Sequence, residues 1–223
     1  MGCMVELTIP ETPTVAVLGG TGPQGMGLGY RLAASGVPVL IGSRSPDRAA
    51  EAAQEIGFGA TGDDNPVVAE QADLAIIAIL WAGHEALVSS LAAELAGKVV
   101  IDCVNPLGFD KRGAFALDVP EGSAAEQAQA HLPDSVVVGA FHNVSAVLLN
   151  DRSLAEIPED VLVLGEVREA TDAVVALASR VPGMRGLYGG RLRNCAQIEA
   201  LTANLISINR RYKTHAGLRI TGI

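Results

Sequence analysis

The stretch that decides the fold comprises residues 15–29 and reads VAVLGGTGPQGMGLG. Its first four residues are apolar and predict a buried strand, which runs directly into a cluster of glycines. Apolar residues at helical spacing follow from Met26 onward. The stretch therefore predicts a strand, a tight turn and a helix, which together open an α/β sheet with helices on both faces.

The glycines of this turn fit the pattern G-x-G-x-x-G at Gly20, Gly22 and Gly25. The first glycine permits the tight turn, the second lets a pyrophosphate approach the backbone, and the third allows close packing of helix on strand. The helix that opens at Pro23 presents unpaired N–H groups and its positive dipole end to a phosphate. The turn predicts a dinucleotide site; the alternative is a plain glycine-rich turn, since Gly makes up 25 of 223 residues.

The end of the next expected strand, at residues 37–41, indicates which dinucleotide binds. An NAD-dependent protein usually carries Asp or Glu there for the ribose 2′-hydroxyl. This chain instead has Ser43 and Arg44, with Arg48 one helical turn further on. Guanidinium groups bind phosphate strongly, so these residues favour NADP(H) over NAD(H). The alternative is that both arginines are solvated charges at the start of a helix.

The composition, 49% hydrophobic and 18% charged, is that of a globular protein with one large domain or a domain with a modest appendage. No run of 18 apolar residues predicts a membrane span, and the N-terminal residues do not form a secretory signal. The three cysteines are odd in number and far apart, so we expect a reducing cytoplasmic location with no disulfide and no metal site.

The charge is distributed unevenly along the chain. The net charge is −9, yet the last 50 residues hold eight Arg and Lys against one Glu. This asymmetry suggests that the C-terminal part meets an anionic ligand. Nucleic acid is excluded as that ligand, because the whole chain is acidic, aromatic residues make up only 4%, and no nucleic-acid-binding motif is present.

Strands and helices alternate through the first 140 residues. The expected strands are 15–18, 37–41, 58–61, 73–80, 98–103 and 135–139, and the expected helices are one from Pro23 and those at 46–56, 65–71, 84–95 and 122–131. Right-handed crossovers turn this order into a doubly wound, or Rossmann, parallel sheet. Its ligands are expected at the carboxyl ends of the strands.

Beyond residue 143 the pattern changes to strands at 161–164 and 185–188, a helix at 167–180 and a long closing helix at 194–212. One apolar stripe of the closing helix consists of Ile198, Leu201, Leu205 and Ile208. We therefore expect a flexible N-terminal extension (1–13), an NADP-binding Rossmann domain (14–143) and a small C-terminal αβ unit ending in a long helix (144–223).

Three strand ends carry the remaining candidate residues. Leu80 and Trp81 follow one strand, and Trp81 is either a platform for a cofactor ring or an ordinary loop aromatic. His84 either opens a helix or touches a ligand. Asn105 either shapes the nicotinamide site or merely turns the chain, and His142, at another strand end, is either catalytic or structural.

Together these motifs resemble the NADPH-dependent reductases of the deazaflavin coenzyme F420. The resemblance rests on the glycine turn, the Ser43-Arg44 pair, the Ala140-Phe141-His142 strand end and the closing helix with the preceding Gly189-Gly190, and it covers residues 14–223. It implies reversible hydride transfer between NADP(H) and the deazaflavin, with the two rings stacked in the cleft between the two units.

The resemblance also implies roles for individual residues. Thr21, Pro23 and Gln24 would contact the pyrophosphate, Ser43, Arg44 and Arg48 the 2′-phosphate, and Leu80, Trp81, Asn105, Ala140, His142 and Val144 the two rings. Family members often carry an apolar pair where this chain has Asn143, Val144 and Ser145, and the basic residues 210–213 are a second departure. The coenzyme carries a phosphate and a glutamate tail, which suits a basic C-terminal unit.

Two other functions stay open: an NADP-dependent imine or ketone reductase, and a non-enzymatic NADP(H) sensor. The first needs a proton donor beside the substrate, and no Tyr-x-x-x-Lys motif supplies one. For the deazaflavin reductase we expect direct hydride transfer in which His142 orients a ring or donates one hydrogen bond. The apolar residues of the closing helix and of the tail (Leu218, Ile220, Ile223) predict a homodimer joined through the C-terminal unit.

Overall fold

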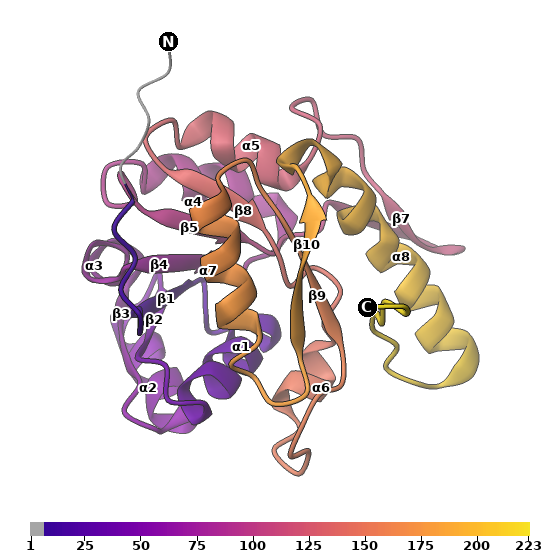
Figure 1. Cartoon of the computed structure of the whole chain (residues 1–223), viewed down its shortest axis with the longest axis horizontal. Helices are drawn as coiled ribbons and strands as arrows, with labels where there is room; N and C mark the ends of the chain where they lie inside the picture. Colours follow the sequence, from indigo (N-terminus) through magenta and orange to yellow (C-terminus); the bar gives the residue numbers. More distant parts are fainter. Residues whose placement is uncertain (1–6) are drawn as a thin grey trace.

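The computed structural model describes residues 7–223, and its centre is an eight-stranded sheet with the order β10-β9-β8-β5-β4-β1-β2-β3 (Figure 1). Its parallel part consists of β1 (Val15–Leu18), β2 (Val39–Ser43), β3 (Thr61–Asp64), β4 (Leu74–Ile77), β5 (Val99–Asp102) and β8 (Val136–Gly139). All residues of β1, β4, β5 and β8 are buried, which explains their unbroken apolar sequences.

Helices cover both faces of the sheet, and each face has its own apolar core. One core includes residues of α1 (Pro23–Ala34), α2 (Pro46–Ile56) and α7 (Arg168–Ala178). The other includes residues of α3 (Asn65–Gln71), α4 (His84–Ser90), α5 (Ala124–His131) and the start of α8 (Cys195–Tyr212). This confirms the expected doubly wound fold.

The direction of winding reverses beside β1, which pairs with β2 on one side and with β4 on the other. The chain proceeds outward through β2 and β3, and then returns to continue through β4, β5 and β8. The glycine turn after β1 and the loop after β4 therefore diverge at this point. Doubly wound proteins bind their ligands in the crevice that such a switch point creates.

The C-terminal strands extend the same sheet. β9 (Asp160–Leu164) and β10 (Arg185–Gly190) run parallel to each other, and β9 pairs antiparallel with β8 through Gly139 and Leu164. The small C-terminal αβ unit thus shares the sheet of the nucleotide domain, and α8 closes the chain as its long helix (Figure 1). A functional division near residue 143 stays a prediction.

One predicted strand lies at a different place. Residues 58–61 were expected to be extended, but β3 begins at Thr61. Gly57, Phe58 and Gly59 have φ angles of 76°, 53° and 81°, a left-handed conformation that an extended strand does not allow. These residues form a turn after α2 and delay the strand.

A hairpin and two one-turn helices were not predicted. They are β6 (Leu107–Asp110) and β7 (Gly113–Ala116), with η1 (Trp81–Gly83) and η2 (Leu192–Asn194). Residues 144–150, whose apolar sequence is compatible with a helix or an irregular segment, contain the short helix α6 (Ala146–Asn150). The hairpin turn is held by Asp110, whose Oδ1 accepts hydrogen bonds from the N–H groups of Arg112 and Gly113. The hairpin stands outside the main sheet and packs along α8 (Figure 1).

Part of the expected N-terminal extension contacts the rest of the protein. Residues 1–6 lie outside the described residues, so that part of the expectation has no structural counterpart. Leu7 and Ile9, however, pack against the core. Among residues 7–223, no helix is both long and apolar enough to cross a membrane.

Arg31 joins α1 to the segment after α6. Its side chain is only 6% exposed and donates to the carbonyl oxygens of Leu148, Leu149, Asp151 and Leu154 over distances of 2.5 to 3.0 Å. The carbonyls of Leu148 and Asp151 also accept backbone N–H groups, and the charged donor adds to these bonds at the end of a short helix. This one guanidinium group therefore fixes the start of the C-terminal unit against the nucleotide domain.

We expect Arg31→Met to lower the free energy of unfolding by about 3 kcal/mol, because four carbonyls, one of them buried, lose a charged donor. Urea denaturation followed by circular dichroism measures the change. The matched control is Arg152→Met, since Arg152 is exposed and its contacts are a hydrogen bond to Glu55 O, an exposed ion pair with the Glu55 carboxylate and a stacking contact with Tyr30. Equal stability of the two variants would contradict the role of Arg31.

Candidate functional site

Each glycine of the turn after β1 has the environment that its expected task requires. The N–H of Gly20 donates to the carbonyl of Gly42 at 2.9 Å, and a Cβ on Gly20 would lie 2.6 Å from Val17 O. A Cβ on Gly25 would lie 2.5 Å from the Cα of Gly20, so only glycine lets α1 pack this closely on the turn. A Cβ on Gly22 would meet nothing within 4 Å, which leaves its backbone open to a ligand.

A residue that the sequence did not single out holds this turn in place. Asn65, at the start of α3, is 4% exposed and accepts a hydrogen bond from the N–H of Gly19 at 3.1 Å. The first helical bond of α1 then runs from Met26 N–H to Gly22 O at 2.8 Å. Pro23 is exposed at the helix start, so the positive end of α1 is open to an anion.

The residues expected to bind the 2′-phosphate lie at the end of the neighbouring strand. Ser43 closes β2, and its Oγ accepts a hydrogen bond from Ser45 N–H at 3.3 Å. Arg44 follows directly, Arg48 lies in the first turn of α2, and both side chains are exposed. Two guanidinium groups are thus free to reach a phosphate beside the glycine turn, and their contact with NADP(H) stays a prediction.

A cavity of about 640 Å³ lies at the carboxyl ends of β4, β5 and β8. The hairpin and α8 form its other walls. The lining residues are Gln24, Ala78, Ile79, Leu80, Trp81, Ala82, Cys103, Val104, Asn105, Leu107, Phe109, Leu117, His142, Asn143, Val144, Ser145, Ala146, Thr202, Leu205, Ile206, Asn209 and Ala216. Its volume suits a drug-sized organic ligand.

The structure brings most of the predicted ring-binding residues into this cavity. Leu80, Trp81, Asn105, His142 and Val144 all line it. Ala140 is fully buried and absent from the lining. Two walls were not predicted from the sequence, one formed by the hairpin and one by α8. The residues of α8 that line the cavity are Thr202, Leu205, Ile206 and Asn209. These four residues of α8 lie on one face of the helix, which is rotated from the apolar stripe that we expected. Two of the four are polar, so a search for apolar periodicity does not find this face.

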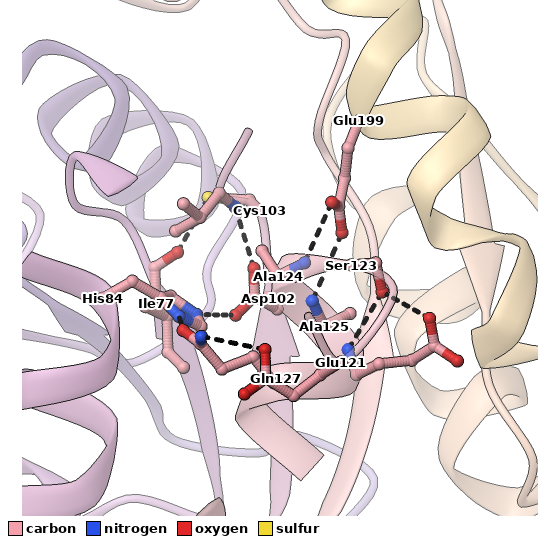
Figure 2. Close-up of polar contacts among 12 residues, drawn as sticks. Ile77, His84, Asp102, Cys103, Glu121, Ser123, Ala124, Ala125, Gln127 and Glu199 are labelled. Atoms are coloured by element: carbon pink, nitrogen blue, oxygen red, sulfur yellow. Dashed lines mark hydrogen bonds and ion pairs between the residues drawn. The ribbon is translucent and has the colours of Figure 1, made fainter. Parts of the chain in front are cut away.

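Behind the cavity, a buried ion pair joins α4 to the end of β5. Asp102 is 0% exposed, its Oδ2 lies 2.6 Å from Nε2 of His84, and its Oδ1 accepts from Val104 N–H at 2.9 Å (Figure 2). The other ring nitrogen of His84 lies 2.9 Å from Oε1 of Gln127. Burial disfavours a charged ring, but the hydrogen bond and charge of Asp102 outweigh it, so the pKa of His84 is raised.

This ion pair positions two residues of the cavity. The indole of Trp81 stacks on the His84 ring, with the ring centroids 5.4 Å apart and an angle of 29° between the planes. Asp102 fixes the turn at Val104, and Asn105 comes next. His84 is therefore a support for the lining rather than a part of it, which answers the question that the sequence left open.

Asn105 offers an unused acceptor to a ligand. Its Nδ2 donates to the carbonyl of His142 at 2.9 Å, which orients the amide. Its Oδ1 is buried and has no hydrogen-bond partner among the described residues. A buried carbonyl oxygen without a partner costs free energy unless a ligand satisfies it. The amide groups of a nicotinamide or of a deazaflavin ring are suitable donors, so this residue fits such rings.

The ring of His142 is buried in the wall of the cavity. The residue is 4% exposed, and neither ring nitrogen has a hydrogen-bond partner among the described residues. One ligand atom each from His142, Cys195 and Glu199 lie within 4.8 Å of one another. Burial lowers the pKa of His142 to about 4. The ring is therefore neutral at physiological pH.

Polar contacts attach α8 to the strand ends. Glu199 is 2% exposed and accepts hydrogen bonds from the N–H groups of Ala124 and Ala125, at 3.0 and 3.2 Å, at the start of α5 (Figure 2). Burial raises the pKa of Glu199 to about 7, although these two bonds oppose that rise. Asn143 donates to Thr202 Oγ1 at 2.9 Å and so holds α8 against the strand end.

Comparison with known proteins identifies the family. A sequence model of the family described as NADP oxidoreductase, coenzyme F420-dependent, matches residues 14–106. A protein of Methanothermobacter marburgensis named F420-dependent NADP reductase is 37% identical over 221 residues, which cover 94% of this chain and 98% of that protein. This chain belongs to the coenzyme F420-dependent NADP oxidoreductase family.

Further relatives of this family agree over nearly the whole chain. A protein of Methanocaldococcus jannaschii with the same name is 35% identical and covers 94% of this chain and 98% of its own length. A solved structure from an Arthrobacter species, assigned as an F420-dependent NADP reductase, superposes with a TM-score of 0.81 at 25% identity. It covers 93% of this chain and 99% of that one, so the C-terminal unit is part of the shared fold.

Arg44→Asp should weaken NADPH binding by about ten- to a hundredfold, because it removes a charged contact worth about 1.5 to 3 kcal/mol. Binding of NADH should be unchanged or tighter, since Asp suits a free 2′-hydroxyl. Isothermal titration of both nucleotides measures the change. Equal affinity of the unmutated protein for NADPH and NADH would refute the assignment.

Proposed function

We propose that the protein transfers a hydride reversibly between NADP(H) and the deazaflavin coenzyme F420, with the two rings stacked in the cavity at the switch point. The observation that supports this proposal is that the glycine turn leads directly into the cavity. The open backbone at Gly22 suits the pyrophosphate, and Gln24, two residues later, already lines the cavity. A dinucleotide bound along α1 thus has its nicotinamide end directed into the ring-sized space.

The residues of the cavity favour a reaction without acid–base catalysis. Among its lining residues there is no Asp, Glu, Lys, Arg or Tyr, and the one His is neutral. An imine or ketone reductase needs a proton donor beside the reacting carbon. A deazaflavin accepts hydride at carbon, and its ring nitrogen takes a proton from solvent. The composition of the cavity therefore favours the deazaflavin over the imine or ketone.

The contribution of the protein is orientation and exclusion of water. When bound, NADP(H) and the deazaflavin supply the hydride donor and acceptor. Trp81 offers a flat face held by His84, Asn105 offers its free Oδ1, and the hairpin contributes Phe109 as an apolar wall. Holding two reactants in a reactive geometry lowers a barrier by as much as about 7 to 11 kcal/mol.

The test is whether the purified protein bleaches the visible absorbance of coenzyme F420 when NADPH is added. A non-enzymatic sensor would bind NADPH without bleaching. Gly22→Ala is a sharp control, because the new methyl group meets no protein atom within 4 Å and Gly22 has an ordinary φ of −85°. This variant should fold with unchanged stability and lose NADPH binding and bleaching together.

His142→Ala should lower turnover only about tenfold to a hundredfold, because the ring positions its neighbours and transfers no proton. Since the pKa of His142 is about 4, its charge does not change near neutral pH. The variant and the unmutated protein should therefore show the same pH dependence of turnover from about pH 6 to 8. A loss of about ten-thousandfold with normal binding of both cofactors would show that His142 is an acid.

We also infer a homodimer joined through the C-terminal unit. Ile208, Tyr212, Ile220 and Ile223 are large apolar or aromatic side chains that are 38% to 75% exposed. Light scattering should give a mass of about 46 kDa, twice the 23.0 kDa of one chain. Ile208→Arg should shift the mass toward the monomer, whereas Phe58→Arg, at a distant turn, should not. A monomer at micromolar concentration would contradict the inference.

The state of the cysteines bears on the cellular location of the protein. Cys103 and Cys195 are free and buried thiols. Free thiols suit a reducing compartment, so we propose that the reaction takes place in the cytoplasm. Fractionation of the source cells followed by immunodetection tests this.

A further inference from the structure

The cavity extends along α8 toward the C-terminal end of that helix. Thr202, Leu205, Ile206 and Asn209 line it, and they recur on one helix face. Seven residues of α-helix span about 10 Å. The far end of the cavity therefore lies beside the last turn of α8.

The chain turns back to the cavity after this helix. Thr214 N–H donates to the carbonyl of Asn209 at 3.3 Å, and Ala216 N–H donates to Asn209 Oδ1 at 2.6 Å. Ala216, like Asn209, lines the cavity. The segment 210–215, which we call the loop 210–215, consists of the last residues of α8 and the turn after them, and it connects two residues that line the cavity, Asn209 and Ala216.

This loop is strongly basic. Arg210, Arg211 and Lys213 are all exposed, and no Asp or Glu occurs among residues 200–223. The two acidic residues that contact the tail after this loop, at residues 217–220, are otherwise occupied or shielded. Asp160 pairs with Arg185 and Arg219, and Glu159 is 6% exposed beneath Gly217.

Helix geometry separates the two arginines, because at 100° per residue Arg210 flanks the stripe that ends at Asn209. Lys213 follows the helix in a left-handed conformation, in the turn between Asn209 and Ala216, which both line the cavity. Arg211 lies on the opposite side of α8. Cations at a helix C-terminus also stabilise the helix dipole, but this effect is the same for Arg210 and Arg211 because both lie in the last turn. A ligand in the cavity would contact Arg210 and not Arg211.

We propose that the loop 210–215 binds the anionic tail of the deazaflavin coenzyme, with Arg210 and Lys213 contacting its phosphate and glutamate carboxylates. This rests on the proposed function, because it assigns the tail of the same substrate. With the ring in the cavity, a tail leaving at the far end passes the loop. The loop then selects the full coenzyme over a deazaflavin that lacks the phosphate and the glutamates.

Equilibrium binding without NADPH tests the assignment. Titrations that follow deazaflavin fluorescence measure the Kd of coenzyme F420 and of the deazaflavin that ends at its sugar alcohol. The variant Arg210→Gln/Lys213→Asn should raise the Kd of the full coenzyme about three- to thirtyfold and change that of the short deazaflavin less than about twofold. Asn at 213 tolerates the left-handed backbone there, where φ is 53°.

The matched control is Arg180→Gln/Arg211→Gln, which removes the same charge from positions that do not face the cavity. It should leave both dissociation constants within about twofold of the unmutated protein. Equal effects of the two double variants on the full coenzyme, or equal effects of the first on both deazaflavins, would overturn the assignment. The bleaching assay with the short deazaflavin and NADPH separately tests the proposed function, since that substrate does not need the loop.

Discussion

A single buried carboxylate holds one wall of the cavity in place. Asp102 lies at the end of a central strand, where water is excluded, and its Oδ2 lies 2.6 Å from the ring of His84, whose pKa it raises. A buried pair of this kind is costly to break, because removing one partner leaves an uncompensated charge. The geometry of the Asp102–His84 pair is therefore fixed. The pair positions Trp81, which stacks on the His84 ring, and Asn105, which follows the turn that Asp102 holds at Val104.

The other side of the cavity depends on how α8 is attached. Glu199 binds the free N–H groups at the start of α5, which are partial positive charges, and Asn143 bonds to Thr202. These contacts join residues that are 55 or more positions apart in the chain. The site is thus formed between the strand ends of the nucleotide domain and a helix that arrives at the end of the sequence.

The local features of the nucleotide site could be predicted from the sequence. The strand, the turn and the helix at residues 15–34 lie where the apolar runs and the glycines place them, because backbone conformation and close packing leave few other residues possible at Gly20 and Gly25. The third strand was misplaced, since the left-handed conformation of Phe58 is uncommon for that residue type. The hairpin β6–β7 was missed because each strand has only four residues, too few to show a clear period.

The sequence by itself determined the doubly wound fold, the dinucleotide turn and the charge at Arg44 and Arg48, since each depends on interactions within a few residues. Only the tertiary structure decided that β9 and β10 join the main sheet, that His84 supports the cavity instead of lining it, and that the polar face of α8 forms a wall. These outcomes depend on contacts between distant segments. Such contacts leave no periodic pattern in the sequence, because any apolar strand or helix face can be buried against several partners.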